Sequence, residues 1–168
     1  MKVRSDFVTN SSSSSFVLAF NKSKDYYDFL DGCEQDDYEQ LALLVQDSID
    51  LKPEDERVKE AIEYINAYYR FVNYDEVLLQ NKFGDRWDYS DWREIASYRN
   101  SEEYDNLLQE LFNNDCGYKT AINTIENSEI VVAETIWDTS GGLLNWAIRN
   151  GFLESCFRRY LVVRWNVG

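Results

Sequence analysis

The chain has 168 residues, which is enough for one domain with a hydrophobic core. Its 31 acidic and 17 basic residues give a net charge of -14, and this excess of carboxylates argues against direct binding to nucleic-acid phosphates. The chain contains no histidine, which excludes Ser-His-Asp and Cys-His catalysis and all histidine metal sites.

The three cysteines, Cys33, Cys116 and Cys156, are far apart in the sequence and form no C-x-x-C motif. An odd and scattered set of this kind favours reduced thiols over a disulfide framework or a zinc site. The apolar runs are shorter than the ~20 residues of a membrane helix, and the first residues lack the apolar segment of a secretory signal. We therefore expect a cytoplasmic protein without a cofactor and without a membrane partner. The sequence does not indicate the oligomeric state.

A run of five serines lies near the N-terminus and ends at Phe16. Serines bury too little apolar surface to offset the conformational entropy that they lose on folding. We therefore predict a flexible arm over residues 1–15 and a single acidic α+β domain over residues 16–168. In such an arm the hydroxyls would be open to phosphorylation, or to a modifying or processing enzyme that reads the run as a tag. The candidate modification residues are Ser11, Ser12, Ser13, Ser14 and Ser15.

The string F-V-T-N-S-S-S-S-S-F over residues 7–16 resembles a signature at the start of many uncharacterised bacterial proteins. The resemblance is confined to this N-terminal segment. It implies membership of that group, and it implies no activity, cofactor or site residue.

The next elements are predicted from apolar patterns. A continuous apolar run over residues 16–20 indicates a buried strand. Ser23 is a suitable N-cap for a short helix, and Gly32 is placed to end that helix.

Residues 35–72 predict two helices joined by a short link at Pro53, which suits the first position of a helix. Apolar residues recur at helical spacing in both segments, so we expect an antiparallel helical hairpin. Residues 25–63, which include most of this hairpin, hold 14 acidic and three basic side chains. The candidate partner-binding residues are Asp36, Asp37, Glu39, Asp47, Asp50, Glu54, Asp55, Glu56, Glu60 and Glu63.

Residues 73–100 show the least regular pattern, and helices resume near Ser101. This irregular segment holds Asp85, Asp88 and Asp91, with the aromatic residues Trp87, Tyr89 and Trp92 between and beside them. Carboxylates can bind Mg²⁺ or Ca²⁺ or act as a hydrolytic acid–base pair. The EF-hand pattern is absent, however, and solvated carboxylates are the more ordinary explanation. We therefore assign no metal site and no catalytic residue.

The last part of the chain predicts a strand over residues 129–137, a helix that ends near Gly151, and a strand over residues 159–167. If these strands were parallel neighbours, they would form a right-handed βαβ unit. Four arginines near this end (Arg149, Arg158, Arg159 and Arg164) form a basic cluster that we expect to pair with the excess acid of the chain. The predicted fold is α+β, with a sheet of about three strands (16–20, 129–137 and 159–167) covered by helices.

The uneven charge predicts a non-enzymatic acidic protein that binds a basic protein partner. One specific form is a nucleic-acid mimic that inhibits a phage-defence or DNA-handling protein. Two alternatives remain open at this point. The protein is a substrate whose serine run is modified, or it is a carboxylate-dependent hydrolase built around Asp85, Asp88 and Asp91.

Overall fold

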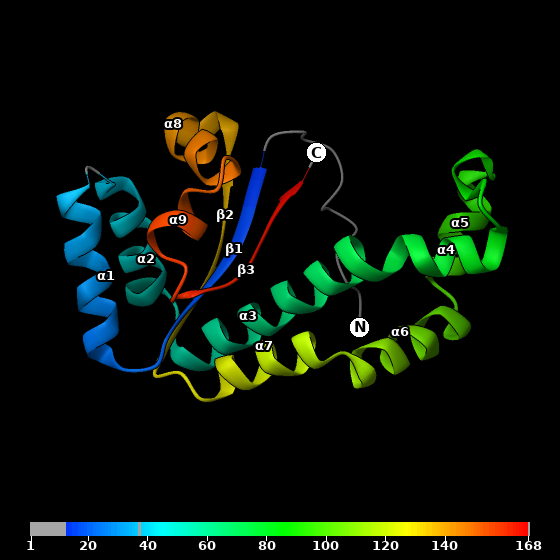
Figure 1. The fold of residues 1–168 in the computed structure, drawn as a ribbon, viewed down its shortest axis with the longest axis horizontal. Coiled ribbons are helices and arrows are strands. Elements are labelled where there is room, and N and C mark those ends of the chain that lie inside the picture. The colour runs from blue at the N-terminus through cyan, green and yellow to red at the C-terminus, as the bar shows by residue number, and fades with distance from the viewer. Residues whose placement is uncertain (1–12, 37, 168) are drawn as a thin grey trace.

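The computed structural model describes residues 13–36 and 38–167, with the side chains of residues 138–141 and 167 left aside. Helices and strands alternate unevenly along the chain, and Figure 1 shows their arrangement. The elements are β1 (Ser13–Phe20), α1 (Ser23–Gln35), α2 (Glu39–Leu51), α3 (Glu54–Tyr68), the π-helical η2 (Tyr69–Tyr74), α4 (Asp75–Phe83), the 3₁₀-helical η3 (Trp87–Tyr89), α5 (Trp92–Arg99), α6 (Glu102–Asn114), α7 (Cys116–Glu126), β2 (Ile130–Trp137), α8 (Asp138–Arg149), α9 (Phe152–Cys156) and β3 (Leu161–Val167).

The three strands form one antiparallel sheet in the order β2-β1-β3. Val17 on the central strand β1 lies opposite Ala133 on β2 and Val163 on β3. The predicted α+β class and the three predicted strands are therefore confirmed. β2 and β3 run in the same direction, because each is antiparallel to β1, but β1 lies between them. The considered βαβ unit of neighbouring parallel strands does not form, since its two strands enclose a third.

β1 takes the central position because its side chains are apolar toward both faces of the sheet. Val17 and Ala19 belong to one buried cluster, which includes side chains of α3 and α7. Phe16, Leu18 and Phe20 point the other way, into a cluster with side chains of α1, α2, α8 and α9. A continuous apolar run is the pattern expected of a strand that is covered on both faces. The sheet is thus enclosed between two helical layers (Figure 1).

The helical hairpin predicted over residues 35–72 is present as two helices, but these do not form a packed pair. Leu41 and Val45 of α2 join the cluster of Phe16, whereas Ala61 and Ile65 of α3 join the opposite one. The chain therefore passes around the β2 edge of the sheet between α2 and α3. The helix that packs along α2 is α1. Sequence periodicity defines an apolar face but not its partner, and both helices cover the sheet instead of each other.

Gly32 does not end the first helix, which continues to Gln35. Its lack of a side chain serves packing instead, because a Cβ atom at this position would lie 3.3 Å from Cε1 of Phe157. That separation is shorter than ordinary van der Waals contact. The glycine therefore lets α1 approach the chain that leads into β3.

The segment 73–100 is more regular than predicted. It forms α4, η3 and α5, and Gly84 ends α4 with a positive φ of 84°. Leu78, Leu79 and Tyr98 of this segment are buried in the same cluster as Val17. The α3–η2–α4 run carries these helices well past the end of the sheet (Figure 1). Short helices contain too few turns to show a clear apolar period, which explains the error.

Candidate protein-binding surface

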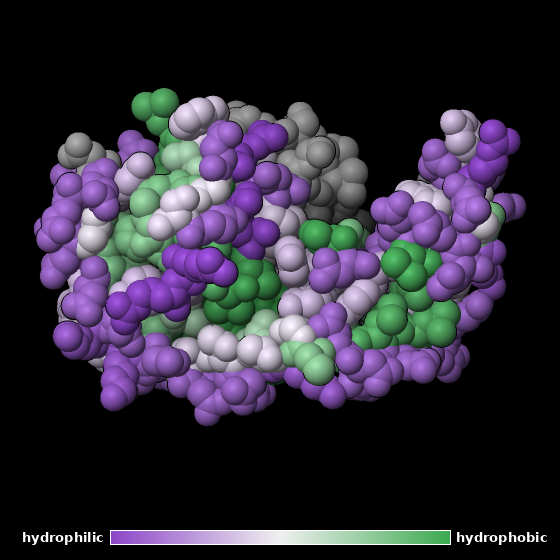
Figure 2. Space-filling view, in the orientation of Figure 1, coloured by the Kyte–Doolittle hydropathy of each residue, from purple (hydrophilic) through white to green (hydrophobic). Residues whose placement is uncertain are grey.

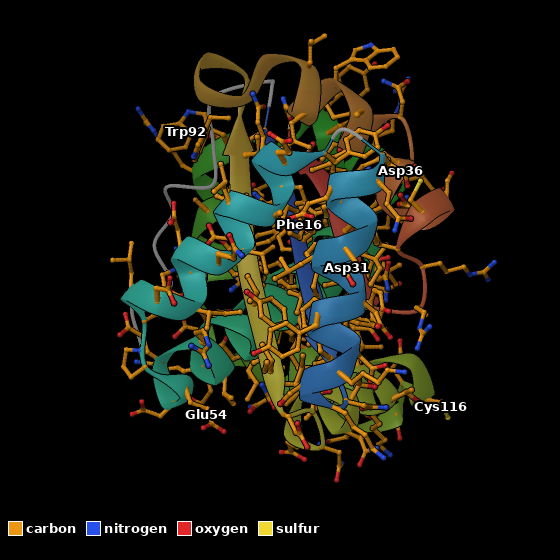
Figure 3. All side chains as sticks on the ribbon, turned by 90° about the vertical axis from the view of Figure 1, so that its left-hand side faces the viewer. Phe16, Asp31, Asp36, Glu54, Trp92 and Cys116 are labelled. Atoms are coloured by element: carbon orange, nitrogen blue, oxygen red, sulfur yellow. The ribbon has the colours of Figure 1, made fainter. Side chains whose placement is uncertain are left out.

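α1 and α2 lie side by side as the outer layer on one face of the sheet (Figures 1 and 3). Residues 23–51 contain nine acidic side chains and one basic one, Lys24. The apolar positions of these helices face the core, so the carboxylates are left on the solvent side. We call the following set the acidic face: Asp28, Asp31, Glu34, Asp36, Glu39, Asp47 and Asp50, all of which are exposed.

Hydrogen bonds to neighbouring elements fix the position of this layer. The amide and hydroxyl of Ser23 donate to the carboxylate of Glu129 over 2.7 and 2.8 Å, which ties the start of α1 to the segment before β2. These bonds stabilise the ionised carboxylate and lower the pKa of Glu129. At the other end, the buried Arg57 donates to the carbonyl oxygens of Ile49 and Lys52, both over 2.9 Å. The guanidinium thereby satisfies carbonyls at the C-terminus of α2 that the helix leaves unpaired.

The predicted partner-binding residues fall into two groups. Asp36, Glu39, Asp47 and Asp50 lie on the acidic face, and Asp37 lies outside the described residues. The other group belongs to α3, beyond the β2 edge, and Figure 3 places Glu54 away from Asp31 and Asp36. Its members are Glu54, Asp55, Glu56, Glu60 and Glu63.

The α3 group is also less strongly acidic than the α1–α2 layer. Glu60 is half-buried and pairs with Lys52 over 2.8 Å, and Lys52 reaches Glu134 of β2 over 3.5 Å. Lys59 is exposed within the same helix. The ten predicted residues therefore do not form one surface on a single hairpin, and this part of the expectation is corrected.

Sequence reasoning missed the contribution of α1. The predicted site omits Asp28, Asp31 and Glu34, although they lie within the acidic stretch that begins at residue 25. The density of acidic residues after residue 25 indicates that these three could contribute. Only the packing of α1 on α2, however, places them on the same face as the carboxylates of α2. The layer also exposes apolar side chains: 58% of Leu43 and 80% of Leu51 are accessible to solvent.

Part of the serine run belongs to the sheet. Ser13–Ser15 form the start of β1 and are buried between β2 and β3, so the predicted boundary at residue 15 is corrected. The Ser15 hydroxyl shares a hydrogen bond of 2.8 Å with that of Thr135, and Ser14 donates to Asn166 over 3.2 Å. A modifying enzyme cannot reach these hydroxyls without extracting the central strand. Ser11 and Ser12 lie outside the described residues.

The carboxylates considered for a hydrolase lie at the surface, and one of them caps a helix. Asp91 is the N-cap of α5 and accepts from the amide of Arg93 over 2.9 Å, while Asp85 and Asp88 are exposed. Within the described residues, no group of three or more acidic or cysteine side chains is arranged to hold a metal ion. The capping role of Asp91 is an ordinary structural use of aspartate.

Among the described residues whose burial is known, the buried carboxylate is Asp75, and its bonds hold the fold together. Asp75 accepts from Nε of Arg99 over 3.0 Å and from the hydroxyl of Tyr104 over 2.7 Å. Burial raises the pKa of Tyr104, and its bond to Asp75 adds to that rise. A carboxylate whose two oxygens are engaged by Arg99 and Tyr104 is poorly placed to exchange protons with a substrate. The network joins α4, α5 and α6.

Two arginines of the C-terminal basic cluster pair internally, as expected. Arg159 pairs with Asp25 of α1 over 3.1 Å, and Arg164 pairs with Glu154. The free thiols differ in environment: Cys33 is buried, whereas Cys116 and Cys156 are exposed. Burial raises the pKa of the Cys33 thiol to about 12, so it remains protonated at neutral pH.

No protein-family model matches the chain, and no curated protein or solved structure matches it. Among the described residues, none of the helices combines the length and apolar character needed to cross a bilayer.

Proposed function

We propose that the protein is a non-enzymatic binding protein whose acidic face docks on a basic protein partner. The single observation that carries this proposal is the acidic face itself. It presents exposed carboxylates from two adjacent helices, with Lys24 as the one basic residue of that stretch. Within the described residues, Lys24 pairs with Asp28, over 4.0 Å. The remaining carboxylates keep their charge available to an external partner.

The apolar residues within this layer supply what charge alone does not. Electrostatic attraction raises association rates, but buried apolar area gives an interface most of its lasting affinity. Leu43 and Leu51 are exposed on α2, beside carboxylates such as Asp47. A matching partner would surround an apolar patch with lysine and arginine side chains.

Proteins that bind nucleic acid form the partner class that fits best. Their basic grooves already select surfaces with closely spaced negative charge. In this form of the proposal, the protein mimics nucleic acid and inhibits a phage-defence or DNA-handling protein by occupying its groove. The proposed compartment is the cytoplasm, where proteins of this class act.

A pull-down from bacterial lysate tests the proposal with two variants of equal charge. The first, Asp31→Lys/Glu34→Lys/Asp47→Lys, reverses three charges on the acidic face. The control, Asp105→Lys/Glu110→Lys/Glu126→Lys, reverses three exposed carboxylates on α6 and α7. We expect the wild type and the control to retain the same protein at about 50 mM salt. Both should lose it at about 500 mM, where the Debye length is only a few ångströms.

Because both variants change the net charge equally, a difference between them shows that the position of the carboxylates matters for binding. The acidic-face variant should retain less than about a tenth of the partner, which corresponds to about 1.4 kcal/mol of binding free energy. Competition by duplex DNA is expected for the mimic form. Equal loss in both triple variants, or retention that ignores salt, would contradict docking through the acidic face.

A further inference from the structure

The two edges of the sheet differ in the side chains and the space beside them. At the β2 edge, Thr135 shares a hydrogen bond of 2.9 Å with the hydroxyl of Tyr64, and Glu134 pairs with Lys52. Within residues 130–137 and 162–166, neither edge strand makes a backbone hydrogen bond outside the sheet to a described residue. An edge strand in this condition presents backbone donors and acceptors to an incoming strand.

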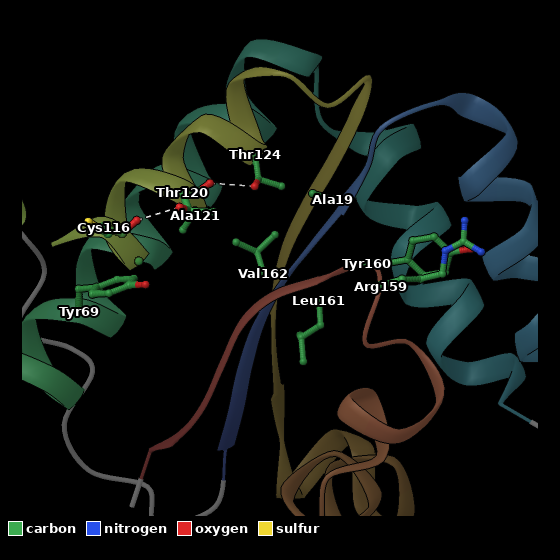
Figure 4. Close-up of a pocket in the computed structure, with 11 residues that line it drawn as sticks. Ala19, Tyr69, Cys116, Thr120, Ala121, Thr124, Arg159, Tyr160, Leu161 and Val162 are labelled. Carbon is green, nitrogen blue, oxygen red and sulfur yellow. Dashed lines mark hydrogen bonds between the residues drawn. The ribbon is translucent and has the colours of Figure 1, made fainter.

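A cleft of about 480 Å³ lies beside the first half of the β3 edge (Figure 4). Leu161 and Val162 of β3 form one side, and Thr120 and Thr124 of α7 form the other. Ala19 of β1 also lines the cleft. Figure 2 shows apolar atoms in a hollow between α7 and β3, next to strongly hydrophilic side chains.

An edge strand that faces a helix across a cleft of mixed polar and apolar lining has the geometry by which proteins bind extended peptides. The peptide adds to the sheet through its backbone, and alternate side chains enter the cleft. The hydroxyls of Thr120 and Thr124 each donate to a carbonyl one turn earlier, over 2.8 Å. Their oxygen lone pairs remain able to accept from a bound ligand.

The charge at the start of β3 indicates the end of the peptide that lies there. Arg158 and Arg159 precede this strand and are exposed, and the Arg159 guanidinium lies 4.9 Å from the ring centre of Tyr160. Arg159 lines one end of the cleft, but its guanidinium pairs with Asp25 of α1 and points away from Thr120 and Val162 (Figure 4), so Arg158 is the basic residue considered at this end. Antiparallel pairing is the more stable arrangement, and it would place the C-terminal end of the peptide beside Arg158.

We propose that this cleft binds an extended segment of another protein, paired antiparallel to β3. An apolar side chain of the segment packs against Val162, and a carboxylate at its C-terminal end meets Arg158. The required partner is therefore apolar and acid-ended, in contrast to the basic partner of the acidic face. The two surfaces lie on different elements, so this inference does not depend on the proposed function.

The probe is a display library of random peptides with free C-termini, from which one enriched peptide is labelled for fluorescence polarisation. Thr120→Trp fills the cleft from an exposed position on α7, and Lys119→Trp places the same ring on α7 outside the cleft lining. Arg158→Glu reverses the charge at the acid-binding end, and Arg93→Glu makes the same change on α5. Thermal melts of all four variants confirm that each is folded.

We expect enriched peptides to be apolar and to end in an acidic residue. Thr120→Trp should weaken binding more than tenfold and Arg158→Glu about fivefold, whereas Lys119→Trp and Arg93→Glu should bind like the wild type. Bound peptide should shift the amide resonances of residues 117–124 and 161–163. The proposal is overturned by a library without enrichment or by unchanged affinity in Thr120→Trp. A wild-type dimer that Thr120→Trp converts to a monomer would also overturn it, because the occupant would then be a second copy.

Discussion

Asp115 shows how a single carboxylate supports two parts of the fold. It is the N-cap of α7 and accepts from the amide of Tyr118 over 3.0 Å. It also accepts from the hydroxyl of Tyr74, at the end of η2. The bond from Tyr74 contributes most to lowering the pKa of Asp115, because it stabilises the ionised form.

The lowered pKa predicts how Asp115→Asn changes stability with pH. Asparagine keeps the cap but loses the charge-assisted bonds, so we expect a loss of about 1 kcal/mol in the free energy of unfolding at pH 7. The contribution of Asp115 is present above the ordinary pKa of aspartate. It disappears as the pH falls through the lower pKa of the folded state.

Urea denaturation of the wild type and Asp115→Asn between pH 7 and pH 3 measures this difference. The gap between the two proteins should be constant down to about pH 5 and should close below about pH 4. A gap that is the same at every pH would show that ionisation of Asp115 does not contribute. The residue-scale explanation would then be wrong.

At the scale of elements, β1 is where sequence and structure differ most instructively. Its apolar half, residues 16–20, was recognised as a buried strand. The serine half was not, because polar composition alone indicates an exposed arm. Ser13–Ser15 are ordered as a strand because they pair with β2 on one side and with β3 on the other. This pairing satisfies the backbone hydrogen-bonding groups of the three serines.

Substitutions at Ser15 test the burial of this part of β1. Ser15→Ala loses a hydrogen bond to Thr135, and Thr135 keeps its bond with Tyr64, so we expect a loss of about 1 kcal/mol. Ser15→Asp puts an unpaired carboxylate at a fully buried position and should cost at least about 3 kcal/mol. Chemical denaturation compares both with the wild type. An aspartate variant as stable as the alanine variant would mean that Ser15 is exposed in solution.

The prediction of an irregular segment over residues 73–100 is wrong for a different reason. Its helices are short, and the side chains that anchor them, such as Leu79 and Tyr98, are spaced across separate elements. Each helix therefore contains too few turns for a repeating apolar pattern to be recognised. The buried bonds of Asp75 to Arg99 and Tyr104 join partners 24 and 29 residues apart, which no local pattern reports.

At the scale of the whole molecule, the net charge of -14 has an energetic cost. Like charges repel in the folded state more than in the extended chain, and salt screens that repulsion. We predict that raising NaCl from about 20 to about 500 mM increases the melting temperature by about 3 °C, which corresponds to about 1 kcal/mol in a domain of this size.

Thermal melts followed by circular dichroism measure this effect, and the charge-reversal variants supply its control. Asp31→Lys/Glu34→Lys/Asp47→Lys lowers the negative charge of the most acidic layer, so its melting temperature should rise less with salt than that of the wild type. A melting temperature that stays constant or falls with salt would show that charge repulsion is not a significant part of the stability.

The α+β class, the three strands and the concentration of acidic residues between residues 25 and 63 follow from the amino-acid sequence. These depend on local composition and periodicity, which are set by the chain alone. Tertiary packing, in contrast, makes β1 the central strand, puts α2 and α3 on opposite faces, and brings α1 and α2 together in the acidic face. It also places α7 beside the edge of β3 and so forms the cleft. Those arrangements depend on which apolar surfaces pack together, and the contacts between these surfaces join residues that are distant in the sequence.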